Sequence, residues 1–211
     1  ISSAASDVYK RQIYVDTGAI YRTVGLAAYR TGIDRHDEPA VKALLPKLSI
    51  EMRYNEAGEQ RMFLDGEDVS EAIRMPEISI CASDVSSLPA VRSFLLEMQR
   101  KLAREHNVVM DGRDIGTVVL PDADLKIFLT ASAEQRAKRR MLELEAKGVD
   151  ASFDEVLKDI EYRDDQDTKR AAAPLRAAED AVRVDTSSLN FEESAAVLAG
   201  LVIDRLSPKQ E

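Results

Sequence analysis

Short apolar runs that alternate with helical patterns constrain the fold of this chain more than any other feature. Residues 13–15, 108–110, 125–129 and 182–184 each have the length and composition of a buried strand, and helical patterns lie between most of them. Short strands that alternate with helices are typical of a parallel sheet covered by helices on both faces. The sequence therefore predicts an α/β fold with a parallel sheet flanked by helices.

The clearest helical pattern spans residues 89–106, where Val91, Leu95, Met98 and Leu102 form one apolar stripe that would face the core. Other helices are expected at residues 19–30, 39–48, 131–147, 153–170 and 191–206. With 211 residues, of which 45% are hydrophobic, the chain is long enough to bury a sheet beneath these helices.

The sequence pattern changes at residues 34–84, which we predict to be a β-rich insertion into the helix–strand chain. Residues 50–54 and 61–64 are short strand candidates, and residues 55–58 between them have the composition of a hairpin loop. The predicted domains are a core of residues 13–33 and 85–211, this insertion at 34–84, and a helical lid at about 132–170.

Charge and composition exclude several classes of partner. The formal net charge of −9 argues against nucleic acid, because affinity for a long polyanion depends on Lys and Arg that neutralise its phosphates. A small phosphorylated ligand needs only a local cluster of cations. No apolar run approaches the roughly 18 residues of a membrane span, so no membrane partner is expected. The single cysteine, Cys81, excludes a disulfide framework and favours a cytoplasmic location.

No resident metal site is expected, because His36 and His106 are the only histidines and lie far apart in the sequence. Both are predicted to be ordinary surface or loop residues.

Polar and charged residues follow directly after predicted strands, which is where ligands bind in parallel α/β sheets. Asp16, Thr17 and Gly18 end the first strand, and Tyr21 and Arg22 lie at the start of the following helix. Backbone N–H groups at a helix start favour anions. This segment is therefore a candidate phosphate site.

The segment Asp111-Gly-Arg-Asp-Ile-Gly-Thr117 is the second candidate. Gly112 and Gly116 allow the backbone to come close to a ligand. Arg113 and Asp114 offer a cation and an acceptor side by side, and such a pair can bind a base carbonyl or phosphate and an exocyclic amine. Asp185, after the last strand, is interpreted as an ordinary turn residue.

Two successive helices carry arginines at spacings that place them on one face. Arg163, Asp167 and Arg170 are at positions i, i+4 and i+7, and residues 136, 139 and 140 are arginines at i, i+3 and i+4. Taken alone, each pattern also fits a solvated, salt-bridged face. Together, two such helices joined by a short loop could form a cationic flap that closes over a polyphosphate and excludes water.

Five motifs together resemble the bacterial-type cytidylate kinases, which are nucleoside monophosphate kinases with a P-loop fold. They are DTGAIYR from residue 16, ASDVSSLPAVR from 82, DGRDIGTVVLPDADLKIFL from 111, the arginine-bearing helix at 135–140, and RDDQDTKRAAAPL from 163. They occur in the order of the family, and the resemblance runs from about residue 13 to the C-terminal helix. The strands at 50–64 and GEDVSEAIR at 66–74 resemble the CMP-binding insertion of that family.

The resemblance implies transfer of the γ-phosphoryl group of ATP to CMP or dCMP, with Mg²⁺ as the cofactor. The residues that would clamp the CMP phosphate are Arg22, Arg113 and Arg170. Those that would read the cytosine edge are Ser83, Arg92 and Asp114. Thr17 would lie on the nucleobase side, Tyr21 would flank the nucleotide, and Arg163 and Asp167 would contact the sugar. Arg136, Arg139 and Arg140 would be lid arginines over the ATP phosphates, and with Arg113 and Arg170 they form the predicted catalytic set.

The P-loop of the family, G-x-x-x-x-G-K-[ST], does not occur in this sequence, because none of the nine glycines is followed by lysine. In the family it precedes the position matched by Ile13, where this chain has ISSAASDVYKRQ. We therefore expect residues 1–12 to be foreign or junction sequence, with a genuine divergent N-terminus as the alternative. The fold is expected to miss its first strand and P-loop. We also expect very low kinase activity, and rescue by an upstream P-loop segment.

Two alternative functions stay open at this point. A pseudokinase that holds CMP without ATP is compatible with the missing P-loop. A kinase for adenylate or uridylate is less compatible with Arg92, Asp114 and the insertion. The expected partners are CMP or dCMP and ATP, and the expected state is a monomer.

Overall fold

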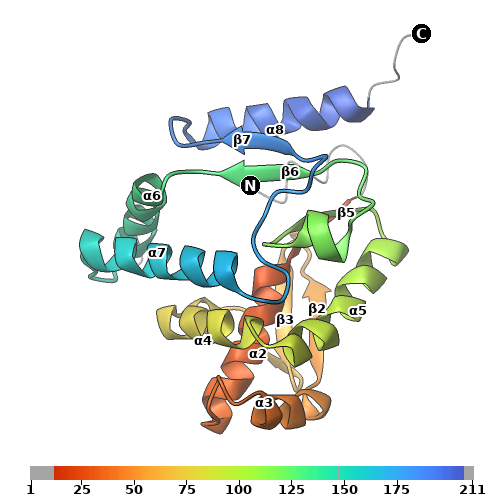
Figure 1. The fold of residues 1–211 in the computed structure, drawn as a ribbon, viewed down its shortest axis with the longest axis vertical. Coiled ribbons are helices and arrows are strands. Elements are labelled where there is room, and N and C mark those ends of the chain that lie inside the picture. The colour runs from red at the N-terminus through yellow and green to blue at the C-terminus, as the bar shows by residue number, and fades with distance from the viewer. Residues whose placement is uncertain (1–11, 147, 207–211) are drawn as a thin grey trace.

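Strands and helices alternate along most of the chain (Figure 1), and the computed structural model describes residues 12–146 and 148–206. The elements are β1 (Ile13–Asp16), α2 (Thr17–Thr31), α3 (Glu38–Leu44), η1 (Leu45–Lys47), β2 (Ile50–Tyr54), β3 (Gln60–Leu64), β4 (Glu67–Asp68), η2 (Ala72–Arg74), α4 (Pro76–Ser86), α5 (Pro89–Glu105), β5 (Val108–Asp111), η3 (Ile115–Val119), β6 (Ile127–Thr130), α6 (Ala133–Ala146), α7 (Phe153–Lys169), β7 (Val182–Asp185) and α8 (Phe191–Leu206). Residues 1–11, within the predicted junction segment, lie outside the described residues. No helix in the described ranges is long and apolar enough to cross a membrane.

Four strands pair in parallel, which confirms the predicted α/β class. β1 pairs with β5, with Ile13 opposite Val108 and Asp16 opposite Asp111. β6 pairs with β7 in the same sense. Among the described residues these strands form two separate two-stranded sheets. The predicted loss of a first strand from a single sheet stays a prediction.

The predicted hairpin at residues 50–64 is confirmed, and β2, β3 and β4 form an antiparallel sheet. Asn55 shapes the turn, because its side-chain oxygen accepts hydrogen bonds from the backbone N–H groups of Ala57 and Glu59. Gly58 follows with a φ of 75°, which favours glycine. The domain boundaries around this sheet stay a prediction.

Helix α4 was not predicted, because its sequence is short and rich in polar residues. Its apolar side chains nevertheless recur at helical spacing, and Ile78, Cys81 and Val85 are fully buried. Gly25 of α2 lets the two helices approach closely, since a Cβ there would lie 2.8 Å from the backbone nitrogen of Ala82. The segment after the insertion sheet is therefore helical and packs on α2.

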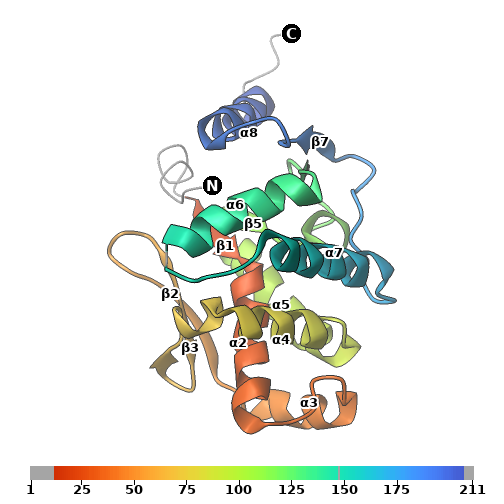
Figure 2. The ribbon, with the colours of Figure 1, turned by 90° about the vertical axis from the view of Figure 1, so that its left-hand side faces the viewer.

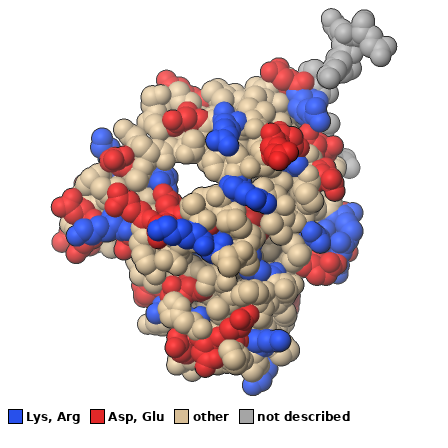
Figure 3. Space-filling model, in the orientation of Figure 1, with Lys and Arg blue, Asp and Glu red and all other residues tan. Residues whose placement is uncertain are grey.

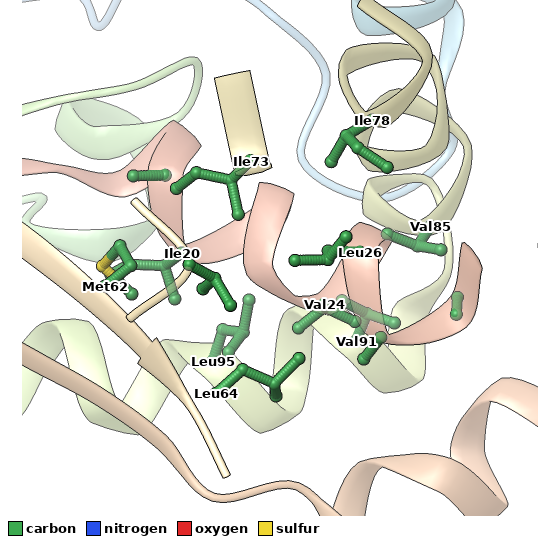
Figure 4. Close-up of a cluster of buried hydrophobic side chains, with 14 of the residues drawn as sticks. Ile20, Val24, Leu26, Met62, Leu64, Ile73, Ile78, Val85, Val91 and Leu95 are labelled. Atoms are coloured by element: carbon green, nitrogen blue, oxygen red, sulfur yellow. The ribbon is translucent and has the colours of Figure 1, made fainter. Parts of the chain in front are cut away.

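The main core lies where α2, α4 and α5 meet the insertion sheet. Figure 4 shows Ile20 and Val24 of α2 beside Leu95 of α5 and Met62 of β3, and all four side chains are almost fully buried. The core therefore joins the insertion to the first helix of the parallel layer.

The α6–α7 hairpin has a small core of its own. Ala137 and Leu144 of α6 pack near Val156 of α7, in a cluster separate from the main core. Both ribbon views place α6 and α7 side by side (Figures 1 and 2). This arrangement suits a unit that moves against the rest of the molecule, as the predicted lid would.

Candidate nucleotide-binding site

Asp16 and Asp111 stand side by side at the carboxyl ends of β1 and β5. The hydroxyl of Thr17 donates a hydrogen bond of 2.7 Å to the backbone carbonyl of Asp111, and Thr17 is buried. Gly112 has no room for a Cβ atom, which would overlap the hydroxyl oxygen of Thr17. The start of α2 and the loop after β5 are therefore locked together, a contact that the two sequence motifs did not predict.

Arg22 points back from α2 toward the end of β1. Its Nη2 donates to Asp16 Oδ2 at 2.7 Å, whereas its Nε is buried and has no hydrogen-bond partner. Burial lowers the pKa of Arg22, and the carboxylate of Asp16 opposes this shift. Buried donors without a partner are rare in folded proteins, which makes the Nε–H of Arg22 a candidate contact for an anionic ligand.

Asp114 lies between two buried arginines. Its Oδ2 is paired with Arg92, and its Oδ1 lies 4.0 Å from Nη2 of Arg170. That Nη2 atom is also buried without a hydrogen-bond partner. Burial lowers the pKa of Arg170, and the neighbouring Arg92 lowers it further. A second unfilled donor therefore lies at the same site.

Tyr21 lies under this ion pair. The guanidinium carbon of Arg92 lies 5.6 Å from the centre of the Tyr21 ring. Burial raises the pKa of Tyr21, so its phenol stays neutral. An aromatic face that supports a guanidinium fixes the plane of its donors.

Asp167 of α7 links the helical hairpin to the loop after β5. Its Oδ2 accepts from Nε of Arg113 at 2.8 Å, and its Oδ1 accepts from Nη1 of Arg170 at 3.2 Å. The side chain of Arg113 is still 56% exposed, so most of its fork is free to meet a ligand. Asp167 therefore orients two of the three predicted phosphate clamps.

Arg163 brings further positive charge to the same place. Burial lowers the pKa of Arg163. The nearby positive charges of Arg140, Arg113 and Arg22 lower it further, and the negative charge of Asp159 opposes the shift. Neighbouring cations disfavour one another's charged forms, and a bound anion relieves this repulsion. Figure 3 shows Lys and Arg atoms around an opening through the molecule on the face that it draws.

Ser83 lies in a neighbouring pocket of about 330 Å³ between α4 and α7. Arg163 lines the same pocket and so connects it to the arginine cluster. The other residues that line this pocket were not singled out as ligands by the sequence, and they include Arg35, His36 and Asp84. Arg35 Nη1 lies 3.5 Å from Asp84 Oδ2, and only 7% of the Asp84 side chain is exposed.

The three predicted lid arginines point to different partners. Arg136 makes a two-pronged ion pair with Asp164 of α7, at 2.8 and 2.5 Å. Arg139 donates to the backbone carbonyls of Thr186 and Leu189, beyond the end of β7. Arg140 pairs with Glu143 at 2.9 Å and is the one that acts electrostatically on Arg163. The structure therefore does not bring the three together, and their role over ATP stays a prediction.

Sequence reasoning also missed Arg74 and Gln60, which approach Asp16 from the insertion. Arg74 ends the GEDVSEAIR motif, and its position at the close of a matched segment was the available signal. Gln60 had none, because it lies within a short alternating strand.

Comparison with known protein sequences identifies the family of this chain. The sequence model of the family described as cytidylate kinase matches residues 4–202. The chain belongs to the cytidylate kinase family. A cytidylate kinase of Caldicellulosiruptor bescii is 52% identical over 181 residues, which cover 86% of this chain and 80% of the relative. A cytidylate kinase of Syntrophotalea carbinolica is 46% identical over 195 residues, or 92% of this chain and 83% of the relative. One of Pseudomonas syringae pv. tomato is 50% identical over 180 residues, or 85% and 79%.

Proposed function

We propose that this protein binds CMP or dCMP as the acceptor of the γ-phosphoryl group of ATP. The observation that carries the proposal is the buried Arg92–Asp114 pair with unfilled guanidinium donors on Arg22 and Arg170. Membership in the cytidylate kinase family supports the same function. The proposal includes the monomeric state that the sequence analysis expects.

The acceptor phosphate fits the arginine cluster. Arg113 and Arg170 share Asp167 as a partner. Arg113 and Arg22 both act electrostatically on Arg163. Guanidinium forks bind phosphate oxygens in a bidentate manner. Binding would neutralise mutual repulsion that is already visible at Arg163. The cluster would hold a phosphate oxygen in line with the donor, which is the main contribution that a protein makes to phosphoryl transfer.

The base fits the Arg92–Asp114 pair and the adjacent pocket. A cytosine edge offers an exocyclic amine and a carbonyl oxygen, which match a carboxylate acceptor and a guanidinium donor. Uracil offers a second carbonyl where cytosine has its amine, so Asp114 would repel it. Ser83 would add a hydroxyl from α4, and Asp167 and Arg163 of α7 would lie toward the sugar.

The helical hairpin would act as the lid. Asp167 already ties α7 to Arg113, so closure of α7 and alignment of the phosphate clamp are one movement. Arg140 acts electrostatically on Arg163 of the arginine cluster, and it is therefore the first candidate to meet the ATP phosphates.

Asp111 is the residue that fits the Mg²⁺ ion carried by ATP. It is open to solvent on one side, yet desolvation and the adjacent Asp16 raise its pKa. Mg²⁺ prefers carboxylate oxygens, and a divalent cation there would relieve the repulsion from Asp16. The ion would help neutralise the phosphates, while Asp16 stays engaged by Arg22.

Calorimetric titration with CMP, UMP and AMP tests the proposal, because acceptor binding can be measured without ATP. CMP should bind most tightly, and Arg170→Lys, which keeps the charge but loses the fork, should weaken CMP binding by about 10- to 100-fold. Arg53→Lys is the control, since Arg53 pairs with Glu51 on the exposed side of the insertion. Equal affinity for the three nucleotides, or an unchanged affinity in Arg170→Lys, would contradict the proposal.

A further inference from the structure

The insertion sheet makes direct contact with the strand that carries the phosphate site. Gln60 of β3 grips the backbone of Asp16 on both sides: its Oε1 accepts from Asp16 N at 2.8 Å, and its Nε2 donates to Asp16 O at 3.2 Å. The hydroxyl of Tyr54 on β2 donates to the carbonyl of Tyr14 at 2.9 Å. Side chains of the insertion therefore take hydrogen-bonding positions along β1 that a neighbouring strand would otherwise fill.

The two carboxylate oxygens of Asp16 have different partners, one at the start of α2 and the other on two arginines. Its Oδ1 accepts from the backbone N–H of Ala19 at 2.9 Å and so caps α2. Its Oδ2 lies 2.7 Å from Nη2 of Arg22 and 3.3 Å from Nη2 of Arg74. Both oxygens are thus occupied, and a small rotation of Asp16 would disturb the cap and the arginine together.

The position of Arg22 depends on this carboxylate. Arg22 is held through Nη2, which leaves its buried Nε–H without a partner. Arg74, which comes from the insertion, competes for the same oxygen and lowers the pKa of Arg22, although burial is the larger cause of that shift. The insertion therefore acts on Arg22 in two ways, through the backbone of Asp16 and through its side chain.

We propose that Gln60 is a positioning residue for the acceptor phosphate, which it serves by fixing Asp16 so that Arg22 keeps its Nε–H free for that phosphate. The proposal rests on the proposed function in one respect, namely that Arg22 meets the phosphate of CMP. It adds a coupling between the insertion and the phosphate clamp. The base-reading pair, Arg92 and Asp114, is bound to other elements and lies outside this chain of contacts.

Binding of CMP and of cytidine, which lacks the phosphate, separates positioning from general damage. Gln60→Ala should weaken CMP binding about tenfold, as expected for the loss of two ordinary hydrogen bonds, and leave cytidine binding unchanged. Tyr54→Phe removes one hydroxyl without a change of shape and should shift CMP binding in the same direction by less. Arg61→Ala is the matched control, because Arg61 adjoins Gln60 but pairs with Asp68 and Glu71 inside the insertion.

Equal losses for CMP and cytidine in Gln60→Ala, or a loss as large in Arg61→Ala, would overturn the proposal. The Nε–H resonance of Arg22 in the unliganded protein, assigned by its disappearance in Arg22→Lys, provides a readout that needs no nucleotide. Its hydrogen exchange should accelerate in Gln60→Ala and not in Arg61→Ala. If the wild-type protein does not prefer CMP, the proposed function fails. If the hydrogen exchange of the Arg22 Nε–H is unchanged in Gln60→Ala, only the positioning role of Gln60 fails.

Discussion

The carboxylate of Asp114 is paired with the guanidinium of Arg92 at a place where only 6% and 10% of the two side chains are exposed. A buried ion pair adds little net stability, because the cost of desolvation offsets the attraction, yet the loss of one partner is costly. Selection for stability alone would therefore not require this pair. Under the proposed function, its value lies in the donor and acceptor that it presents to a base.

Asp114→Ala should lower the free energy of unfolding by about 3–5 kcal/mol, because it leaves the guanidinium of Arg92 buried without its partner. The double variant Arg92→Met, Asp114→Leu should recover most of that loss but no longer distinguish CMP from UMP. Urea unfolding and calorimetric titration measure the two effects. A double variant as unstable as Asp114→Ala would show that the pair is mainly structural.

Gly25→Ala should destabilise the protein by about 1–3 kcal/mol, since the added methyl group would press on backbone atoms of α4 that cannot yield alone. The contact in question is the 2.8 Å approach to the nitrogen of Ala82. Gly200→Ala on α8 is the control, because a Cβ there meets nothing within 4 Å. Alanine in that helix should be neutral or stabilising by up to about 1 kcal/mol. Thermal unfolding of both variants tests the difference in sign.

The insertion sheet should lose stability in acid. Hydrogen bonds from Ser70, followed by the ion pair with Arg61, lower the pKa of Asp68 from 3.8 to about 2. A carboxylate with a depressed pKa in the folded state stabilises the fold above its unfolded pKa, and this contribution is lost as the pH falls from about 4 to 2. Asp68→Asn should flatten this part of the stability profile while leaving its shape at higher pH unchanged. If Asp68→Asn loses stability between about pH 4 and 2 as steeply as the wild-type protein, Asp68 is not the group responsible.

Ser152→Ala should loosen the α6–α7 hairpin before it affects the rest of the molecule. Ser152 and Glu155 form a reciprocal capping box at the start of α7, and such a cap contributes about 1 kcal/mol. Because α6 and α7 share a small separate core, the loss should appear as faster amide exchange in α7 with little change in α5. Uniform acceleration across both helices would mean that the hairpin unfolds only with the whole protein.

Much of the fold follows from local patterns. The stripe from Val91 to Leu102 specified α5, and the strand after it was visible as a short apolar run. Helix α4 escaped notice because its stripe is interrupted by serines, and because its stability depends on contact with Gly25 rather than on helix propensity.

The sequence pointed to several residues that lie together in the structure, but it revealed fewer of the contacts between them. Strand ends and helical spacing singled out Arg22, Arg113, Asp114 and Arg170, because parallel strands bring their carboxyl ends together. Spacing on one face could not reveal that Arg139 turns toward the carbonyl of Thr186. The grip of Gln60 on Asp16 depends on how two sheets distant in sequence meet, which no local pattern encodes.

The division of the parallel strands into two ladders has a consequence for handling the protein. Within the described residues, each ladder of two strands has a backbone edge on either side, and only part of one edge is met by Gln60 and Tyr54. Val109 of β5 and Leu129 of β6 are also partly open, at 36% and 48% exposed. Unpaired edges flanked by apolar side chains attract other strands. Concentrated solutions of this chain should therefore be prone to self-association through these edges, and charged substitutions there should improve its solubility.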